Sequence, residues 1–115
     1  MNIQRIQPNA RMSAAVVHNG FVFVSGQVAD DTNADVAGQT KQILDKIDRI
    51  LAEAGSSKER VLSANIWIAE ASTFNEMNSV WDAWVPAGHT PARACVESKL
   101  AFPQYTVEIG VIAAV

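Results

Sequence analysis

Two stretches of the chain have apolar side chains three and four residues apart, the spacing of an amphipathic helix. The first stretch runs from Asp35 to Ala54. Asp35 can cap its start, because a carboxylate there can accept a hydrogen bond from a free backbone N–H, and Gly55 ends it. The apolar positions of this predicted helix are Val36, Ile43, Leu44, Ile47, Ile50, Leu51 and Ala54.

The second predicted helix begins with Thr73-Phe74-Asn75-Glu76, which fits a capping box. In that motif the side chains of Thr73 and Glu76 each accept a hydrogen bond from the other residue's backbone N–H. Pro86 and Gly88 end the helix, because proline lacks the N–H that a helix needs. Its apolar stripe consists of Phe74, Met77, Trp81, Trp84 and Val85.

The other apolar segments are predicted strands. Asn19-Gly20 is the strongest signal among them, because both residues tolerate the positive φ of a tight hairpin. The order β-β-β-α-β-α-β-β predicts one α+β domain over residues 1–115, with both helices on one face of a single sheet. The predicted strands are Ala14–His18, Phe21–Gln27, Val61–Ala69, Ala92–Ser98 and Tyr105–Ala113, with a further short strand near Ile3–Ile6.

Several predicted strands are apolar on both faces. In Val61–Ala69, alternation places Leu62, Ala64, Ile66 and Ile68 on one face and Val61 and Trp67 on the other. In the last strand, Val107, Ile109 and Val111 are opposed by Ile112 and Ala114. Two helices can cover only one side of such a sheet. A second subunit is therefore the expected cover for the other side.

The composition limits the partners of the chain. Of its 115 residues, 49% are hydrophobic and 18% charged, as in a globular domain, and the net charge is −3. A weakly acidic domain offers no attraction for nucleic acid or anionic membranes. No apolar run approaches the ~20 residues that cross a bilayer. The first 13 residues contain no apolar signal core, so we expect a cytoplasmic protein.

Few residues suit a metal ion or a nucleophile. His18 and His89 are the only histidines, and neither has a partner at ligand spacing. Cys95 is the single cysteine, so no intramolecular disulfide is possible, and its place in a strand is typical of a core residue. We therefore predict no metal and no cofactor.

Arg93 is a candidate for binding an anion. It lies at the start of an apolar strand, in Thr90-Pro91-Ala92-Arg93-Ala94-Cys95-Val96, and alternation puts it on one face with Cys95 and Glu97. A guanidinium there can offer two parallel N–H groups to a carboxylate. The alternative is a surface arginine whose stem lies over the sheet.

Two further polar residues interrupt apolar patterns. Glu108 lies in the strand Thr106–Val111, where a carboxylate costs free energy unless it is paired or used chemically. A structural salt bridge is its alternative. Asn78 lies in the helical stripe between Phe74 and Trp81, where an amide should be hydrogen-bonded, and a structural role is the simpler interpretation.

The whole chain resembles the reactive intermediate deaminase family, also called Rid, YjgF-like or L-PSP-like. The matching segments are Ser25-Gly26-Gln27, the helix end LAEAGSS, the helix FNEMNSVWDAW and, above all, PARACV followed by VEIGVIA. The resemblance implies a chorismate-mutase-like α+β fold, a mixed sheet with two helices on one face. It also implies a homotrimer with active sites between subunits. The implied reaction is hydrolysis of 2-imino acids to 2-oxo acids and ammonia, without a cofactor.

The resemblance also implies roles for particular residues. Arg93 corresponds to the carboxylate-binding arginine, and Glu108 to the glutamate that activates water. The residues that would line the substrate pocket are Ser25, Gly26, Asn78 and Cys95. Many members carry a GPY motif whose tyrosine enters the site. Here that stretch reads Ala10-Arg11-Met12-Ser13, with Met12 at the tyrosine's place, which resembles a divergent subgroup.

Two other functions compete with imine hydrolysis. Some members of the family are called ribonucleases or translation inhibitors, although the acidic charge and the absence of a histidine pair argue against cleavage of RNA here. A non-catalytic protein could instead use the Arg93 cleft to hold a small carboxylate. Turnover of an imine generated by another enzyme separates this binding function from catalysis.

Overall fold

The computed structural model describes residues 2–115 and contains the predicted helices and strands in the predicted order. The strands are β1 (Gln4–Ile6), β2 (Ala15–His18), β3 (Phe21–Gln27), β4 (Val61–Ile68), β5 (Ala92–Glu97) and β6 (Val107–Ala114). The helices are α1 (Val36–Glu53) and α2 (Phe74–Trp84), with short 3-10 turns η1 (Lys58–Arg60) before β4 and η2 (Ala71–Thr73) before α2.

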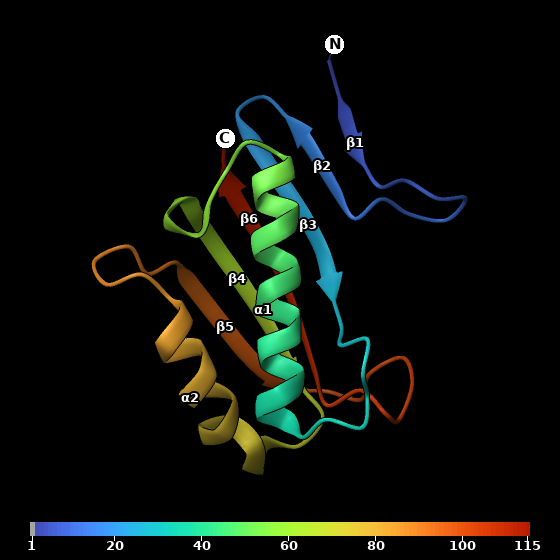
Figure 1. Ribbon diagram of the computed structural model, residues 1–115, viewed down its shortest axis with the longest axis vertical. Helices are drawn as coiled ribbons and strands as arrows, with labels where there is room; N and C mark the ends of the chain where they lie inside the picture. The colour runs from blue at the N-terminus through green and yellow to red at the C-terminus, as the bar shows by residue number, and fades with distance from the viewer. Residues whose placement is uncertain (1) are drawn as a thin grey trace.

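The six strands form one mixed sheet in the order β1-β2-β3-β6-β4-β5. Strands β4 and β5 are parallel, and the other neighbouring pairs within residues 2–115 are antiparallel. Both helices lie on the same face of the sheet, with α2 beside α1 (Figure 1). The predicted α+β architecture is confirmed.

The predicted start and end of α1 and the predicted turn of the first hairpin are confirmed. Asp35 Oδ1 accepts a hydrogen bond from Gly38 N at 2.8 Å, as an N-cap does. Gly55 follows the helix with a φ of +81°, a left-handed conformation that glycine adopts without steric cost. In the hairpin, Asn19 and Gly20 have φ values of +53° and +84°, as the tight turn requires.

The predicted capping box at the start of α2 is wrong. The Thr73 hydroxyl donates to the carbonyl of Glu70 at 2.7 Å, in the turn before the helix. Glu76 Oε2 instead accepts a hydrogen bond from Ala37 N at 3.0 Å. Ala37 lies in the first turn of α1, where backbone N–H groups have no partner within the helix and the helix dipole favours an anion. The Glu76 carboxylate therefore joins α2 to α1.

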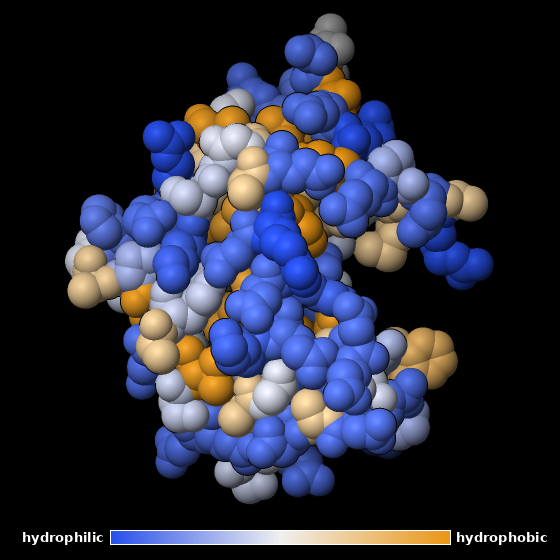
Figure 2. Space-filling model, viewed as in Figure 1, coloured by the Kyte–Doolittle hydropathy of each residue, from blue (hydrophilic) through white to orange (hydrophobic). Residues whose placement is uncertain are grey.

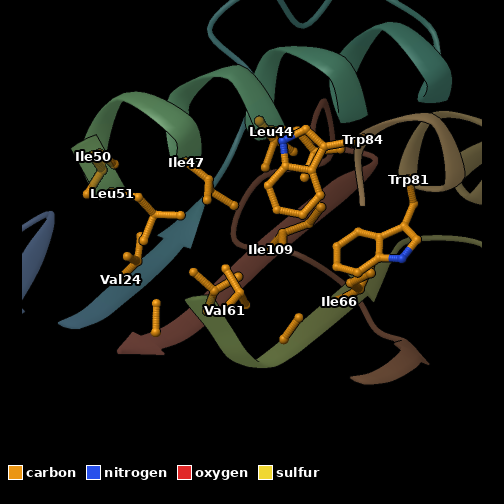
Figure 3. Packing of buried hydrophobic residues seen from close by; sticks show 14 of the residues in the cluster. Val24, Leu44, Ile47, Ile50, Leu51, Val61, Ile66, Trp81, Trp84 and Ile109 are labelled. Carbon is orange, nitrogen blue, oxygen red and sulfur yellow. The ribbon is translucent and has the colours of Figure 1, made fainter. Parts of the chain in front are cut away.

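The core fills the space between the helices and the sheet (Figure 3). Ile43, Ile47 and Leu51 of α1 are fully buried, and the rings of Trp81 and Trp84 of α2 lie 5.3 Å apart between centroids. The strands contribute alternate residues to this core: Val22, Val24, Ala64, Ile66, Ile68, Val107, Ile109, Val111 and Ala113. The residues between them face away from the helices.

One predicted side-chain assignment in β4 is wrong. Val61 is buried and Leu62 is exposed, the reverse of the assignment made from alternation. The pairing of β4 with β6 shifts register between Val61 and Ser63, because a bulge inserts one extra residue there. From Ser63 onward the predicted alternation holds.

Strand β6 begins at Val107, two residues later than the predicted start at Tyr105. The backbone N–H of Thr106 donates to Gln39 Oε1 of α1 at 3.0 Å, and that of Tyr105 donates to the carbonyl of Phe102. Because these two N–H groups donate to a side chain of α1 and to the preceding turn, they form no hydrogen bonds with a neighbouring strand of the described chain.

The sheet face opposite the helices, which we call the open face, carries large apolar side chains. Phe21 and Phe23 of β3 are 41% and 46% exposed, and Val96 of β5 is 51% exposed. Trp67 and Ile112 lie half-buried on the same face. The predicted two-sided apolar sheet is therefore present. Among residues 2–115, no helix is long and apolar enough to cross a bilayer.

The bond between the two helices can be tested at Glu76. Glu76→Ala should lower the free energy of unfolding by about 1 kcal/mol, because Ala37 N then loses its acceptor. Glu76→Gln, which keeps an acceptor oxygen, should retain most of the stability. Urea unfolding measures both variants, and equal stability of Glu76→Ala and the wild type would contradict this role.

Candidate active site

Arg93 lies on the helix-bearing side of the sheet, at the edge strand β5. It is in register with Ala64 of β4, whose side chain is buried beneath the helices. Its Nη1 donates a hydrogen bond to Asn78 Oδ1 of α2 at 2.7 Å. Its guanidinium carbon lies 5.7 Å from the ring centroid of Phe74 and 5.3 Å from that of Trp81, within the range of cation–π attraction. The arginine is therefore held by α2.

The Arg93 guanidinium remains available to an anion. The residue is exposed, and among residues 2–115 no carboxylate lies within salt-bridge distance of it. The amide of Asn78 is hydrogen-bonded, as predicted for a polar residue in the helical stripe, and its partner is Arg93. Both interpretations of Arg93 fit this arrangement, so its binding of an anion stays a prediction.

Sequence reasoning missed the aromatic support of Arg93. Phe74 was placed in the core stripe of α2, but it is exposed and lies against the guanidinium. The signal was present in the spacing, since residues 74, 78 and 81 are four and three apart and so share one face of a helix. Only the tertiary structure, which places β5 beside this face of α2, shows that the three residues contact Arg93.

Cys95 follows Arg93 on the same side of β5. It is in register with buried Ile66 and packs half-buried against the core, as predicted. Burial raises the pKa of the Cys95 thiol, and the nearby Arg93 charge opposes that rise. A thiol with a raised pKa is a poor nucleophile at neutral pH. The predicted contact of Cys95 with substrate stays a prediction.

Glu108 lies on the open face, opposite Trp67 of β4. Its neighbours Val107 and Ile109 are buried on the helix side, whereas Glu108 is half-buried. Among residues 2–115 its carboxylate takes part in no salt bridge. The structural salt bridge considered from the sequence is therefore absent from the described part of the chain.

Gly26 makes room for the Glu108 carboxylate. A Cβ atom placed on Gly26 would overlap Glu108 Oε2 and lie 2.9 Å from Glu108 Cδ. The pairing of β3 with β6 shifts register between Val24 and Gln27, so Gly26 sits in a bulge. Bulges of this kind often lie next to active sites, where they direct a side chain.

Ser25 stabilises the same bulge. Its hydroxyl donates to the carbonyl of Ala14 at 3.1 Å, and Gln27 Nε2 donates to both the Ser25 carbonyl and its hydroxyl. These contacts hold the backbone beside Gly26 in place. The side chain of Ser25 therefore has a structural use, and its predicted contact with substrate stays a prediction.

The six predicted site residues form two separate groups. Gly26 and Glu108 lie together on the open face, with Ser25 next to Gly26 in the β3 bulge, whereas Arg93 lies with Asn78 and Cys95 at the β5 edge on the helix side. Arg93 is level with Val111 of β6, three residues from Glu108. Two strand spacings separate the groups laterally, about 10 Å, and the three residues add about 10 Å along the strand. One chain therefore does not bring Arg93 and Glu108 together.

Met12, at the place of the family tyrosine, lies in the exposed loop between β1 and β2. Asn9 shapes this loop, because its Oδ1 accepts hydrogen bonds from the backbone N–H groups of Arg11 and Met12 at 2.8 and 2.9 Å. Strands β1 and β5 are the two edges of the sheet. Met12 therefore lies near the edge opposite Arg93 within one chain.

A small hollow on the open face adjoins Glu108. Its volume is about 140 Å³, and its lining consists of Val24, Gly26, Ser63, Asn65, Trp67, Gly110, Val111 and Ile112. Of these residues, Gly26 lies against the Glu108 carboxylate and Trp67 is opposite Glu108 on β4. The hollow therefore places apolar and small polar groups beside the carboxylate.

A larger hollow of about 450 Å³ lies between the outer surfaces of α1 and α2, on the face shown in Figure 2. Its charged groups are already engaged. Lys41 pairs with Asp45 at 3.5 Å, and Asp48 accepts a hydrogen bond from Trp84 Nε1 at 3.1 Å. Lys58 lies over the Trp84 ring at 5.7 Å. The charged side chains that line this groove therefore have partners within the described part of the chain.

The histidines are apart, as expected. His18 Nδ1 lies 3.0 Å from the carbonyl oxygen of Asn2, and His89 is in the exposed loop after α2. Within residues 2–115, no three side chains of His, Cys, Asp or Glu gather where they could share a metal ion.

The contact between Gly26 and Glu108 generates a stability prediction. Gly26→Ala should displace the Glu108 carboxylate, because the added Cβ overlaps it, and should lower the free energy of unfolding by up to about 1 kcal/mol, since the end of a flexible side chain can shift. Adding Glu108→Ala removes the overlapping atoms and should recover much of that loss. Urea unfolding of both single variants and the double variant measures this coupling. Strictly additive effects would show that the two residues do not interact.

Comparison with known proteins places this arrangement in a family. Residues 2–115 match the family described as Endoribonuclease L-PSP. The RutC family protein YoaB of Escherichia coli strain K12 is 44% identical over 115 residues, which is 100% of both chains. The RutC family protein of Haemophilus influenzae is 43% identical over 114 residues, 98% of each chain.

A solved structure of a family member also matches this fold. NMB1025 of Neisseria meningitidis, a member of the YjgF protein family, superposes with a TM-score of 0.96 and 48% identity, over 99% of this chain and 95% of that one. The match extends over the strands and helices that carry both groups of site residues. The chain therefore belongs to the L-PSP family, also called YjgF or Rid.

Proposed function

We propose that this protein hydrolyses 2-imino acids to 2-oxo acids and ammonia, at a site that two copies of the chain complete. Arg93 of one copy binds the substrate carboxylate, and Glu108 of another activates water. Membership of the Rid family supports a function of this general type.

The observation that best supports the proposal is that the Glu108 carboxylate is half-buried and, within the described residues, unpaired. Its carboxylate is half-buried against Gly26, beside a hollow, and has no salt-bridge partner among residues 2–115. A carboxylate in such a place costs free energy unless it is used. A general base needs this combination of restricted position and free acceptor oxygens.

Arg93 suits the other end of the substrate. A guanidinium can bind a carboxylate through two parallel charge-assisted hydrogen bonds, each stabilising by roughly 1.5–3 kcal/mol. The hydrogen bond to Asn78 is the one that the Arg93 guanidinium makes with residues 2–115, so most of the N–H groups of the guanidinium stay free. Holding the carboxylate fixes the pose of the neighbouring imine carbon and removes an entropic barrier.

The reaction requires little more than these two groups. Water attacks the carbon of the protonated imine while Glu108 accepts a proton from that water, which gives a carbinolamine. The proton on Glu108 passes to the amine nitrogen. The carbon–nitrogen bond then breaks as the hydroxyl gives its proton to the regenerated Glu108 carboxylate, and ammonia leaves the 2-oxo acid. The imine is already an electrophile, so no covalent nucleophile is required.

The separation of the two groups supports a shared site. In a 2-imino acid the carboxylate carbon and the imine carbon are bonded to each other, so the guanidinium and the base must meet around one small molecule. Within one chain they lie on opposite sides of the sheet. Apposition of the apolar open face with another copy, as the family resemblance implies for a homotrimer, could bring the two groups to a common cleft.

Cleavage of RNA is less well supported by these residues. The net charge is −3, whereas binding to a phosphate backbone depends on clustered Lys and Arg. His18 and His89 lie in separate exposed or half-exposed positions and form no acid–base pair. A ribonuclease function would appear as salt-dependent binding of RNA by the wild-type protein.

The role of Glu108 can be tested by Glu108→Gln. The amide keeps the shape but cannot accept the proton, so hydrolysis of an enzymatically generated 2-imino acid should slow by roughly 10²–10⁴. The melting temperature should hardly change. Wild-type protein that binds a 2-oxo acid without any imine turnover would instead identify a carboxylate-binding protein.

The shared site can be tested by mixing two inactive variants. Arg93→Ala and Glu108→Gln should each lack activity alone. When they are unfolded, mixed equally and refolded, about a quarter of the interfaces should combine an intact Arg93 with an intact Glu108 and recover activity. Light scattering should give a particle of about 37 kDa, three times 12.4 kDa. A stable monomer, or mixing without recovery, would refute the shared site.

A further inference from the structure

Every group that holds the Arg93 guanidinium is uncharged. The amide oxygen of Asn78 accepts a hydrogen bond from Nη1 at 2.7 Å. The rings of Phe74 and Trp81 lie 5.7 and 5.3 Å from the guanidinium carbon. An amide oxygen and two aromatic faces fix the plane of a cation without cancelling its charge.

Two carboxylates of the adjoining elements are hydrogen-bonded to backbone N–H groups elsewhere. Glu76, two residues before Asn78 on α2, accepts a hydrogen bond from Ala37 N of α1. Glu97, on the same face of β5 as Arg93, accepts one from Ala71 N at 2.7 Å. Within residues 2–115, neither these acids nor any other forms a salt bridge with Arg93. The cation is therefore in contact with one amide and two aromatic rings, and no charge of the described residues compensates it.

A carboxylate at position 78 would hold the arginine more strongly. Aspartate has nearly the shape of asparagine, and a charge-assisted hydrogen bond is roughly twice as strong as a neutral one. However, that carboxylate would occupy the guanidinium as a competitor of the substrate carboxylate. The Asn78 amide thus binds the Arg93 guanidinium less strongly than a carboxylate would, but it leaves the guanidinium charge free to attract an external anion.

We propose that Asn78 is a positioning residue that orients Arg93 while leaving its charge for the substrate carboxylate. This role rests on the proposed function, because it presupposes that Arg93 binds a 2-imino or 2-oxo acid. It differs from a direct contact with substrate, since Asn78 acts through Arg93.

The decisive variant is Asn78→Asp, tested with pyruvate as the probe. The new ion pair should raise the dissociation constant for pyruvate at least about tenfold. It should leave the melting temperature unchanged or raise it, because the pair adds an attraction within the fold. A merely structural residue would change both properties in the unfavourable direction. Asn75→Asp, which adds the same charge to an exposed position of α2, is the matched control and should bind pyruvate as the wild type does.

A double-variant cycle isolates the action through Arg93. In an Arg93→Ala background, Asn78→Asp should have no additional effect on pyruvate binding. Asn78→Asp with wild-type affinity, or with affinity lost only together with thermal stability, would overturn the role of Asn78. Wild-type protein and Arg93→Ala that bind pyruvate equally would instead overturn the proposed function of Arg93.

A measurement without ligand tests the positioning separately. Nitrogen-15 relaxation at the Arg93 side chain should show an ordered Nε–H in the wild type and a mobile one in Asn78→Ala. A wild-type Arg93 as mobile as that in the variant would refute positioning by Asn78, whether or not the protein binds pyruvate.

Discussion

The packing of both helices against one face of the sheet is the constraint on which the other features depend. Strand β6 lies between β3 and β4, and its residues Val107, Ile109 and Val111 are buried beneath the helices. Its intervening residues must then face the opposite side, where no part of the described chain covers them. The open face consequently combines exposed apolar side chains with Glu108. Removal of this apolar surface from water favours association with another copy.

The same division separates the chemistry of the site into two halves. A bulge and a glycine in β3 give the Glu108 carboxylate its place on the open face. Helix α2 holds Arg93 at the β5 edge on the other side. In the proposed reaction neither half is sufficient alone, because one lacks the carboxylate-binding group and the other lacks the base. A site built in this way would be active only in the assembled protein.

The acidic side chains near the α2 end of the fold have structural uses that leave Arg93 uncompensated. Glu76 satisfies a free N–H at the start of α1, and Glu97 satisfies the N–H of Ala71 at the start of the turn before α2. Both carboxylates thus stabilise the ends of helical segments, where the helix dipole favours them. The fold gains these contacts without neutralising Arg93 of β5, whose guanidinium lies near the Phe74 and Trp81 rings of α2.

The sequence by itself determined the elements, their order and the faces of most strands, because these follow from local spacing: apolar periodicity, the Asp35 cap, Gly55 and the Asn19-Gly20 turn. It also singled out Arg93, Glu108 and Asn78, since each breaks an apolar pattern. Tertiary structure alone decided the bulge that reverses Val61 and Leu62, the use of Glu76 by α1, and the support of Arg93 by α2. It alone put Arg93 and Glu108 on opposite sides of the sheet. These outcomes depend on which residues distant in the chain become neighbours, and local spacing carries no information about that.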